Sequence, residues 1–172
     1  MRCWSRGICS VETLAPGSIV PASSEDLLRL EAFLNPFFQR GELLFIPSEK
    51  LKKNIRRFLL ARQPSGAILG SLGLFEWGKD LVEVRAFAVD ARVRGMGIGS
   101  VLLESALSRA RLDKKKQVFA LTYKTAFFTA RGFCEVPKEN LPHKIWGDCV
   151  LCLNRENCKE KSVIFGLKAQ ED

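Results

Sequence analysis

The apolar positions of this chain follow two different periods, which predict strands and helices in turn. Two long apolar runs, at residues 67–77 and 81–89, are joined by Gly78-Lys79-Asp80, and this arrangement is typical of a β-hairpin. Shorter apolar runs bounded by polar residues predict further strands at residues 18–21, 58–62, 118–121, 133–136 and 162–167.

Apolar residues spaced three and four positions apart predict amphipathic helices between these strands. The first begins at residue 23 or 24, has an acidic first turn and ends before Pro36. The other predicted helices cover residues 47–56, 98–111 and 125–131. Strands that alternate with helices indicate an α/β or α+β fold with a mixed sheet.

Length and composition place these elements in a single domain. The 172 residues suffice for one hydrophobic core, and we expect residues 11–172 to form it. Residues 1–10 carry no clear pattern, so we expect them to be poorly ordered. They also lack the apolar centre of a signal peptide, and no apolar run is long enough to span a membrane. We therefore expect a cytoplasmic protein without a membrane partner.

The chain is basic, with a formal net charge of +8. Its basic residues are dispersed and are not interleaved with aromatic residues, so the charge does not favour nucleic acid as a partner. Small anionic ligands fit this charge, because a positive field concentrates them near the protein.

The segment from Val89 to Ser100 carries the strongest chemical signal. An apolar strand runs into Arg94-Gly95-Met96-Gly97-Ile98-Gly99, and an amphipathic helix follows at once. Glycine lets the backbone approach a ligand closely, and a helix N-terminus directs N–H groups and positive charge at an anion. The pattern predicts a cradle for a pyrophosphate. A dinucleotide fold needs Gly-x-Gly-x-x-Gly, and a triphosphate loop needs Gly-Lys-Ser/Thr, so neither fits.

Two motifs, in this order, resemble the GNAT superfamily of N-acetyltransferases. They read Val89-Asp90-Ala91-Arg92-Val93-Arg94-Gly95-Met96-Gly97-Ile98-Gly99 and Phe127-Phe128-Thr129-Ala130-Arg131-Gly132-Phe133. The resemblance implies one domain around a central mixed, mostly antiparallel sheet, flanked by about four helices. It also implies that the strands at residues 81–89 and 118–121 splay apart, and that the pantetheine arm of acetyl-CoA enters the gap.

The same resemblance assigns residues to acetyl-CoA. The pyrophosphate would lie on the glycine loop, and a backbone N–H between residues 87 and 89 would polarise the carbonyl of the acetyl group. The residues expected to contact acetyl-CoA are Phe87, Ala88, Val89, Arg94, Gly95, Met96, Gly97, Ile98, Gly99, Ser100, Phe127 and Phe128.

Three further segments, at residues 83–89, 119–124 and 141–149, resemble the acetyltransferase domain of the N-acetylglutamate synthase family in its short bacterial form. This likeness implies that the acceptor is the α-amine of L-glutamate, which would place the reaction at the start of arginine biosynthesis. Both substrates would then be small molecules, and the sequence leaves a homodimer open.

Acetyl transfer to an amine needs a general base that takes a proton from the amine. A general acid that gives a proton to the leaving thiolate makes the transfer faster. Glu83 lies where the superfamily often carries its base and would act through a water; an ordinary ion pair with Arg85 is the alternative. Phe128 stands where the superfamily frequently has a tyrosine acid. Tyr123, at a strand end, is the replacement candidate, and packing at the rim is its alternative role.

A glutamate acceptor carries two carboxylates, so its pocket needs cations. Arg85 and Lys124 lie on the two strands expected to flank the cleft. Arg85 could bind the α-carboxylate through two parallel hydrogen bonds, and Lys124 would act as a point charge. Because strand residues alternate in direction, Glu83 and Arg85 should share one face of the sheet.

Late cysteines raise the question of a metal. Cys149, Cys152 and Cys158 could bind zinc, completed by His143 or Cys134, but a single Cys-x-x-Cys pair falls short of a zinc signature. We therefore expect no metal and reduced, packed thiols. Other acceptor amines and a catalytically silent acyl-CoA-binding module remain alternatives, although Arg85 and Lys124 disfavour a polycationic acceptor.

Overall fold

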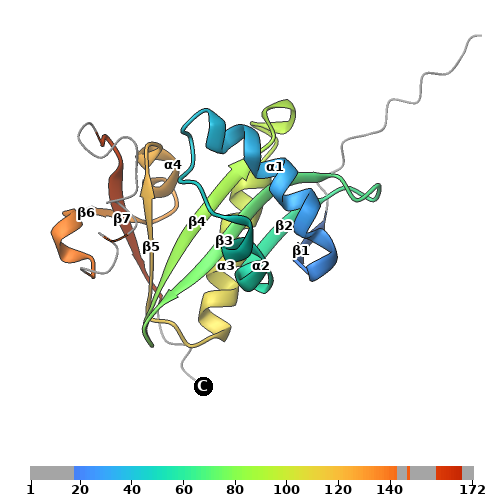
Figure 1. Ribbon diagram of the computed structural model, residues 1–172. Helices are drawn as coiled ribbons and strands as arrows, with labels where there is room; N and C mark the ends of the chain where they lie inside the picture. Colours follow the sequence, from blue (N-terminus) through green and yellow to red (C-terminus); the bar gives the residue numbers. More distant parts are fainter. Residues whose placement is uncertain (1–17, 143–146, 148–157, 168–172) are drawn as a thin grey trace, which may run out of the picture.

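The computed structural model describes residues 18–142, 147 and 158–167, which are built around one mixed sheet (Figure 1). Its seven strands have the order β1-β2-β3-β4-β5-β7-β6. Every neighbouring pair is antiparallel except β4 and β5, which are parallel. The strands are β1 Ser18–Pro21, β2 Phe58–Arg62, β3 Ile68–Trp77, β4 Leu81–Val89, β5 Gln117–Thr122, β6 Cys134–Val136 and β7 Lys161–Gly166.

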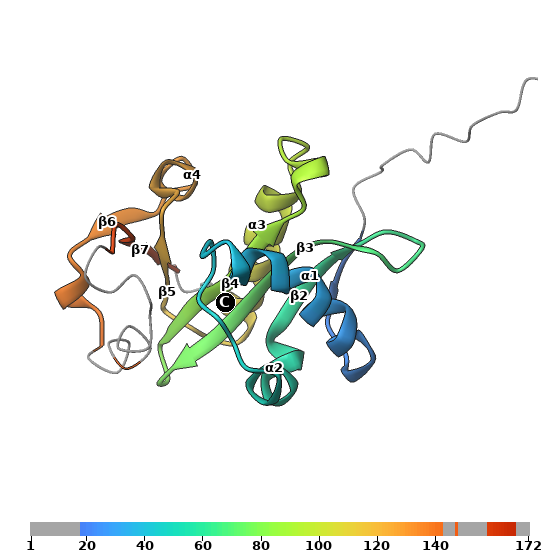
Figure 2. The same cartoon turned by 45° about the horizontal axis from the view of Figure 1, so that its top comes forward.

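Helices cover both faces of this sheet (Figure 2). The four α-helices of the described residues are α1 Leu27–Gln39, α2 Ser48–Asn54, α3 Ile98–Leu112 and α4 Thr125–Thr129. Helices α1 and α2 bury one apolar cluster against the sheet, whereas α3 and α4 bury a second one. The fold class predicted from the sequence is therefore confirmed. Within the described residues, no helix combines the length and apolarity needed to cross a bilayer.

The sheet opens between its two parallel strands, as the resemblance to the GNAT superfamily implied. Pairing of β4 with β5 runs from Leu81 opposite Gln117 to Val84 opposite Ala120 and stops there. Strand β4 continues to Val89 without β5, and the two strands diverge toward the top of Figure 1. On its other edge β4 keeps its antiparallel pairing with β3.

A β-bulge in β4 lies beside this opening, and the sequence did not reveal it. Ser71 of β3 pairs with Ala88 and Gly73 pairs with Arg85, so two residues of β4 oppose one residue of β3. Ala86 in the bulge has a φ of 47°, in the left-handed region. The buried Ser71 hydroxyl donates to the Ala86 carbonyl at 2.9 Å, which holds the bulge in place.

The predicted end of the first helix was wrong. Helix α1 continues through Pro36 to Gln39, and the Arg40 N–H donates to the Pro36 carbonyl at 3.2 Å. Proline removes one backbone donor and disfavours a helix interior, but the extra turn buries Phe37, whose ring lies 5.5 Å from that of Phe33. The burial of this ring offsets the lost hydrogen bond. The expectation for residues 1–10 lies outside the described residues.

A buried carboxylate fixes the start of this helical segment to the sheet. Asp26 is 1% exposed and accepts hydrogen bonds from the Ser23 N–H at 2.8 Å and the Ser23 hydroxyl at 3.1 Å. Arg62, at the end of β2, places its Nη1 2.5 Å from the same carboxylate. Burial alone would raise the pKa of Asp26, but the Ser23 hydrogen bonds and the Arg62 charge together hold that pKa below its ordinary value.

Replacing this carboxylate should destabilise the fold at neutral pH. We expect Asp26→Asn to lower the free energy of unfolding by about 1–3 kcal/mol at pH 7, because a buried charged hydrogen-bond acceptor is lost. A lowered pKa stabilises the fold above the unfolded-state value and ceases to do so as pH falls through the folded-state value. The difference should therefore shrink by pH 3 in urea titrations. Glu25→Gln, an exposed carboxylate of the same turn, is the control; an equal loss there would contradict this assignment.

Candidate functional site

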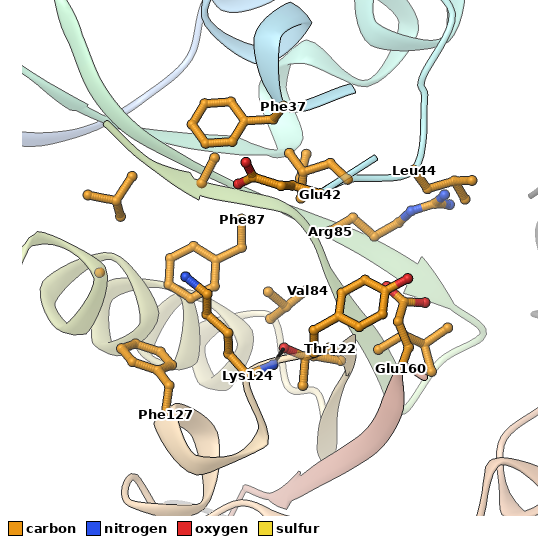
Figure 3. Close-up of a pocket in the computed structure, with 18 of the residues that line it drawn as sticks. Phe37, Glu42, Leu44, Val84, Arg85, Phe87, Thr122, Lys124, Phe127 and Glu160 are labelled. Atoms are coloured by element: carbon orange, nitrogen blue, oxygen red, sulfur yellow. Dashed lines mark hydrogen bonds between the residues drawn. The ribbon is translucent and has the colours of Figure 1, made fainter. Parts of the chain in front are cut away.

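A cavity of about 1480 Å³ occupies the opening between β4 and β5 (Figure 3). It exceeds the 300–1,000 Å³ of an ordinary small-molecule pocket, so it has room for two substrates. Its walls come from the second half of β4, the end of β5, the start of α3, helix α4 and the connection between α1 and α2. These elements meet only because β4 leaves β5.

The glycine loop forms one end of the cavity. Gly97 is the N-cap of α3 with a φ of 85°, and Gly95 has a φ of 84°. A Cβ at either position would meet no atom within 4 Å, so these glycines are needed for backbone conformation and access and not for packing. The first N–H groups of α3 have no acceptor within the helix. This end of the cavity can therefore bind an anion.

Met96 is the predicted cofactor residue that the structure does not bring to the cavity. Its side chain is 48% exposed, and its backbone N–H donates to the Val93 carbonyl at 3.3 Å. The turn between the two positive-φ glycines directs this residue outward. The other predicted cofactor residues line the cavity: Phe87, Ala88, Val89, Arg94, Gly95, Gly97, Ile98, Gly99, Ser100, Phe127 and Phe128.

Three phenylalanines form an aromatic wall between the glycine loop and the sheet. The Phe87 ring lies 5.6 Å from Phe127 and 6.0 Å from Phe128, both edge-on. Phe128 is 4% exposed and also contacts Phe133 at 5.1 Å. Arg131, which sequence reasoning did not single out, lies 3.8 Å above the Phe127 ring and donates to the Ser100 hydroxyl. This arginine thus joins α4 to the start of α3.

Glu83 and Arg85 form a polar centre on β4. The Glu83 carboxylate is 6% exposed and accepts a hydrogen bond from the Trp77 indole N–H at 2.7 Å. Arg85 Nε lies 3.8 Å from Glu83 Oε1, so the two side chains share a face as predicted. The guanidinium also lies 5.3 Å from the centre of the Phe75 ring. The pair exists as an ion pair, but it lies in the cavity wall and not on an outer surface.

Charged groups of both signs line the mouth of the cavity. Lys124, beyond the end of β5, and Glu42, in the connection between α1 and α2, extend into it from opposite walls (Figure 3). Arg94 Nη2 lies 3.5 Å from Glu42 Oε2. A hydrogen bond from Arg40 and the charges of Arg40, Arg94 and Lys124 hold the pKa of Glu42 below its ordinary value. Tyr123 is 48% exposed at the same rim.

Besides Arg131, sequence reasoning missed two parts of the lining. The connection between α1 and α2 contributes an apolar wall, in which Leu44 and Phe45 are 37% and 65% exposed. The apolar run at residues 43–46, which fits no helix or strand, was the signal that could have revealed it. The other part consists of Lys138, Cys158 and Glu160, which only the tertiary fold brings to the cavity.

The residues proposed as zinc ligands lie only partly within the described residues. Cys149, Cys152 and His143 lie outside the described residues. Cys134 is exposed and Cys158 lines the cavity, each as a free thiol. Among residues 18–142, 147 and 158–167, no three His, Cys, Asp or Glu side chains are grouped to hold a metal ion.

The chain is similar in sequence to known acetyltransferases. The pattern that defines the Acetyltransferase (GNAT) family matches residues 25–135. An uncharacterized N-acetyltransferase of Chlorobaculum tepidum is 34% identical over 124 residues, 72% of this chain and 79% of that protein. The amino-acid acetyltransferase of Mycobacterium tuberculosis is 35% identical over 50% of this chain and 51% of its own length. That of Pseudomonas fluorescens is 32% identical over 70% of this chain, which spans only 28% of it.

Solved structures with the same fold include two complexes. N-acetylglutamate synthase from Neisseria gonorrhoeae, complexed with coenzyme A and N-acetyl-glutamate, has a TM-score of 0.79 and 25% identity, over 88% of this chain and 35% of that one. A Mycobacterium tuberculosis protein in complex with CoA has a TM-score of 0.75 and 23% identity, over 88% of this chain and 99% of that one. The second likeness bears on the fold alone.

The positive φ of Gly97 makes this residue a test of the anion cradle. We expect Gly97→Ala to cost about 1–2 kcal/mol in backbone strain and to weaken binding of coenzyme A, the pyrophosphate ligand expected from the sequence, by about tenfold. Isothermal titration calorimetry measures the affinity. Gly78→Ala is a matched control, because Gly78 has a φ of 78° and open space around it but lies in the β3–β4 turn. Equal loss of affinity in both variants would contradict the cradle.

Proposed function

The chain belongs to the Acetyltransferase (GNAT) family, and on this premise we propose that it transfers the acetyl group of acetyl-CoA to the α-amine of L-glutamate. The observation that carries the proposal is the Glu83–Arg85 pair, with 3.8 Å between its charged groups, set in the cavity wall beside the β4 bulge. This pair supplies a carboxylate that can accept a proton and a guanidinium that can bind a carboxylate. The reaction would belong to arginine biosynthesis in the cytoplasm.

Acetyl-CoA fits the two ends of the cavity. The open glycine loop and the N-terminus of α3 would hold the pyrophosphate, with Arg94 beside it. The gap where β4 has left β5 would take the pantetheine arm, which is a chain of peptide-like groups. The thioester would then lie near the bulge, where backbone N–H groups between residues 87 and 89 can stabilise the oxygen as negative charge develops.

The acceptor end of the cavity suits an amino acid. Arg85 would bind the α-carboxylate through two parallel hydrogen bonds, and Lys124 would attract the second carboxylate of glutamate. The names of the relatives support this choice, since several are amino-acid acetyltransferases. The neighbouring N-acetylglutamate synthase complex, with its bound N-acetyl-glutamate, supports glutamate in particular.

The acetyl transfer then needs one proton acceptor and is accelerated by one proton donor. Glu83 takes a proton from the ammonium through a water, and the nitrogen lone pair attacks the thioester carbon. The new C–N bond forms, the C–S bond breaks, and the sulfur leaves with the electron pair as thiolate. Tyr123, which lines the cavity at the end of β5, donates a proton to that thiolate.

A catalytically silent acyl-CoA-binding module is the second candidate function. Phe128 favours it, because a buried phenyl ring at this position cannot donate a proton. Glu83 opposes it, because it sets a carboxylate that can accept a proton in the cavity wall.

The acceptor assignment is tested by release of CoA from acetyl-CoA in the presence of a panel of amino acids. We expect turnover with glutamate, and we expect Arg85→Ala to raise the KM for glutamate about 10- to 100-fold, as loss of a charged hydrogen-bond partner implies. Arg109→Ala, which removes an exposed arginine of α3 outside this cavity, should leave KM unchanged. Turnover with other amines but none with glutamate would overturn the glutamate assignment. Tight CoA binding without any turnover would favour the silent module.

The two catalytic assignments predict different changes in the pH–rate profile. Glu83→Gln should lower kcat about 10²- to 10⁴-fold and remove the acidic limb of the profile, because the proton acceptor is lost. Tyr123→Phe should lower kcat less and remove the basic limb, with the KM values for both substrates nearly unchanged. A Tyr123→Phe variant with an unaltered profile would show that the thiolate leaves without this hydroxyl.

A further inference from the structure

Glu160 is a carboxylate of the cavity wall that no sequence motif marks. We propose that Glu160 binds the ammonium group of the acceptor while Arg85 binds its carboxylate, so that the pair recognises the zwitterionic head of a free α-amino acid. The inference rests on the proposed amino-acid acetyltransferase activity and names the residue that would distinguish an amino acid from a plain carboxylic acid.

The fold places Glu160 at the junction of the two halves of the sheet. It directly precedes β7, whose pairing with β5 begins at Lys161 opposite Thr122. Glu160 therefore lies beside the end of β5, where that strand has separated from β4. Figure 3 shows Glu160 and Arg85 on the same side of the cavity. Arg85 comes from β4, and Glu160 is the residue before β7.

Among the described residues, Glu160 has one weak hydrogen-bond donor and no close ion-pair partner. Its Oε2 lies 4.0 Å from the Cys158 thiol, which is a weak hydrogen-bond donor. The same thiol also contacts Lys138, whose Nζ lies 3.3 Å from the Cys158 sulfur. Burial raises the pKa of Glu160, although the positive charges of Lys138 and Arg85 oppose that change. An arriving ammonium would stabilise the charged form of this partly buried carboxylate.

The other carboxylate of the acceptor end is differently engaged. Glu83 accepts the Trp77 indole N–H at 2.7 Å and has Arg85 at 3.8 Å, so its position is fixed by the protein itself. This arrangement suits a group that takes a proton through water. Glu160 suits a group that holds the ammonium in place. Tyr123, Lys124, Lys138 and Cys158 are further titratable side chains of the described residues that line this cavity.

The complementarity is specific to a zwitterion. An α-amino acid carries its ammonium and carboxylate on one carbon, and a guanidinium and a carboxylate within one pocket match both charges. A dicarboxylic acid without an amine would gain from Arg85 and be repelled by Glu160. The side chain of the acceptor would extend past this head toward Lys124 or the apolar wall at Leu44.

Substitution of Glu160 by glutamine separates these ligands. Glu160→Gln should raise the KM for glutamate about 10- to 100-fold, as loss of a charged partner for the ammonium implies. Inhibition by glutarate, which is glutamate without its amine, should stay unchanged or become tighter. The control is Glu104→Gln, an exposed carboxylate of α3 outside the cavity, which should change neither constant.

The pH dependence gives a second readout. In the wild type, the KM for glutamate should rise as pH falls through the pKa of Glu160, because the neutral carboxyl no longer attracts the ammonium. Glu160→Gln should lose this dependence. An unchanged KM in Glu160→Gln would overturn the proposal, and so would equal weakening of glutamate and glutarate, which would indicate a general distortion of the pocket.

A wrong role for Glu160 can be told apart from a wrong glutamate assignment. If the wild type acetylates another amino acid, the comparison is made with that amino acid and its analogue lacking the amine. Calorimetric titration of the same pair of ligands into CoA-saturated protein gives the comparison without turnover. A preference for the amine-bearing ligand that Glu160→Gln does not reduce overturns the role of Glu160, whichever amino acid is the substrate.

Discussion

The early end of pairing between β4 and β5 is the constraint on which the rest of this molecule depends. After Val84 opposite Ala120, the two parallel strands separate, and the backbone of β4 keeps only its contacts with β3. Buried peptide groups that lose a strand partner need another one. On the β3 side, the Ser71 hydroxyl supplies a partner for the Ala86 carbonyl of the bulge at 2.9 Å. The edge of β4 that faces the cavity can bind a ligand with peptide-like groups.

The ion pairs at the mouth of the cavity are weak enough for an incoming anion to replace them. Glu42 lies among Arg40, Arg94 and Lys124, and its contact with Arg94 is 3.5 Å between side chains that are both more than 40% exposed. Exposed ion pairs of this kind contribute about 0–1 kcal/mol. An anion at the N-terminus of α3 can therefore take Arg94 from Glu42 at little cost, and the basic chain still attracts it from a distance.

Local chemistry explains which features could be predicted from the sequence. Gly97 needed a positive φ at a helix start, and this requirement is visible in the spacing of three glycines. The alternation of Glu83 and Arg85 on one face follows from strand geometry. The predicted helix end at Pro36 was wrong because the burial of Phe37, a tertiary contact, outweighed the tendency of proline to end a helix. Met96 lies outside the cavity lining because the turn between Gly95 and Gly97 directs its side chain outward, whereas the motif treats neighbouring residues alike.

Features that depend on residues distant in sequence were invisible before the fold was known. The bulge is a mismatch between β3 and β4, and neither strand shows it alone. The cluster of Lys138, Cys158 and Glu160 joins the segment after β6 to the residues before β7. The glycine loop, Glu83, Arg85 and Lys124 could be proposed for the cavity from the sequence, because a single loop or strand end places each of them. Leu44, Lys138 and Glu160 could not, because they come from segments that only the fold brings together.

Phe128 bears on the chemistry less than its position in the motif suggests. Its ring is 4% exposed and contacts three other phenylalanines, so a hydroxyl there would lie among apolar rings and would cost free energy without a partner. The reaction also needs a proton acceptor more than a donor. A thiol is far more acidic than an alcohol, so a thiolate is a tolerable leaving group, whereas an ammonium cannot attack until it has lost a proton. Glu83, the proposed base, is therefore the group that the proposed reaction can least spare, and a phenylalanine at position 128 is compatible with that reaction.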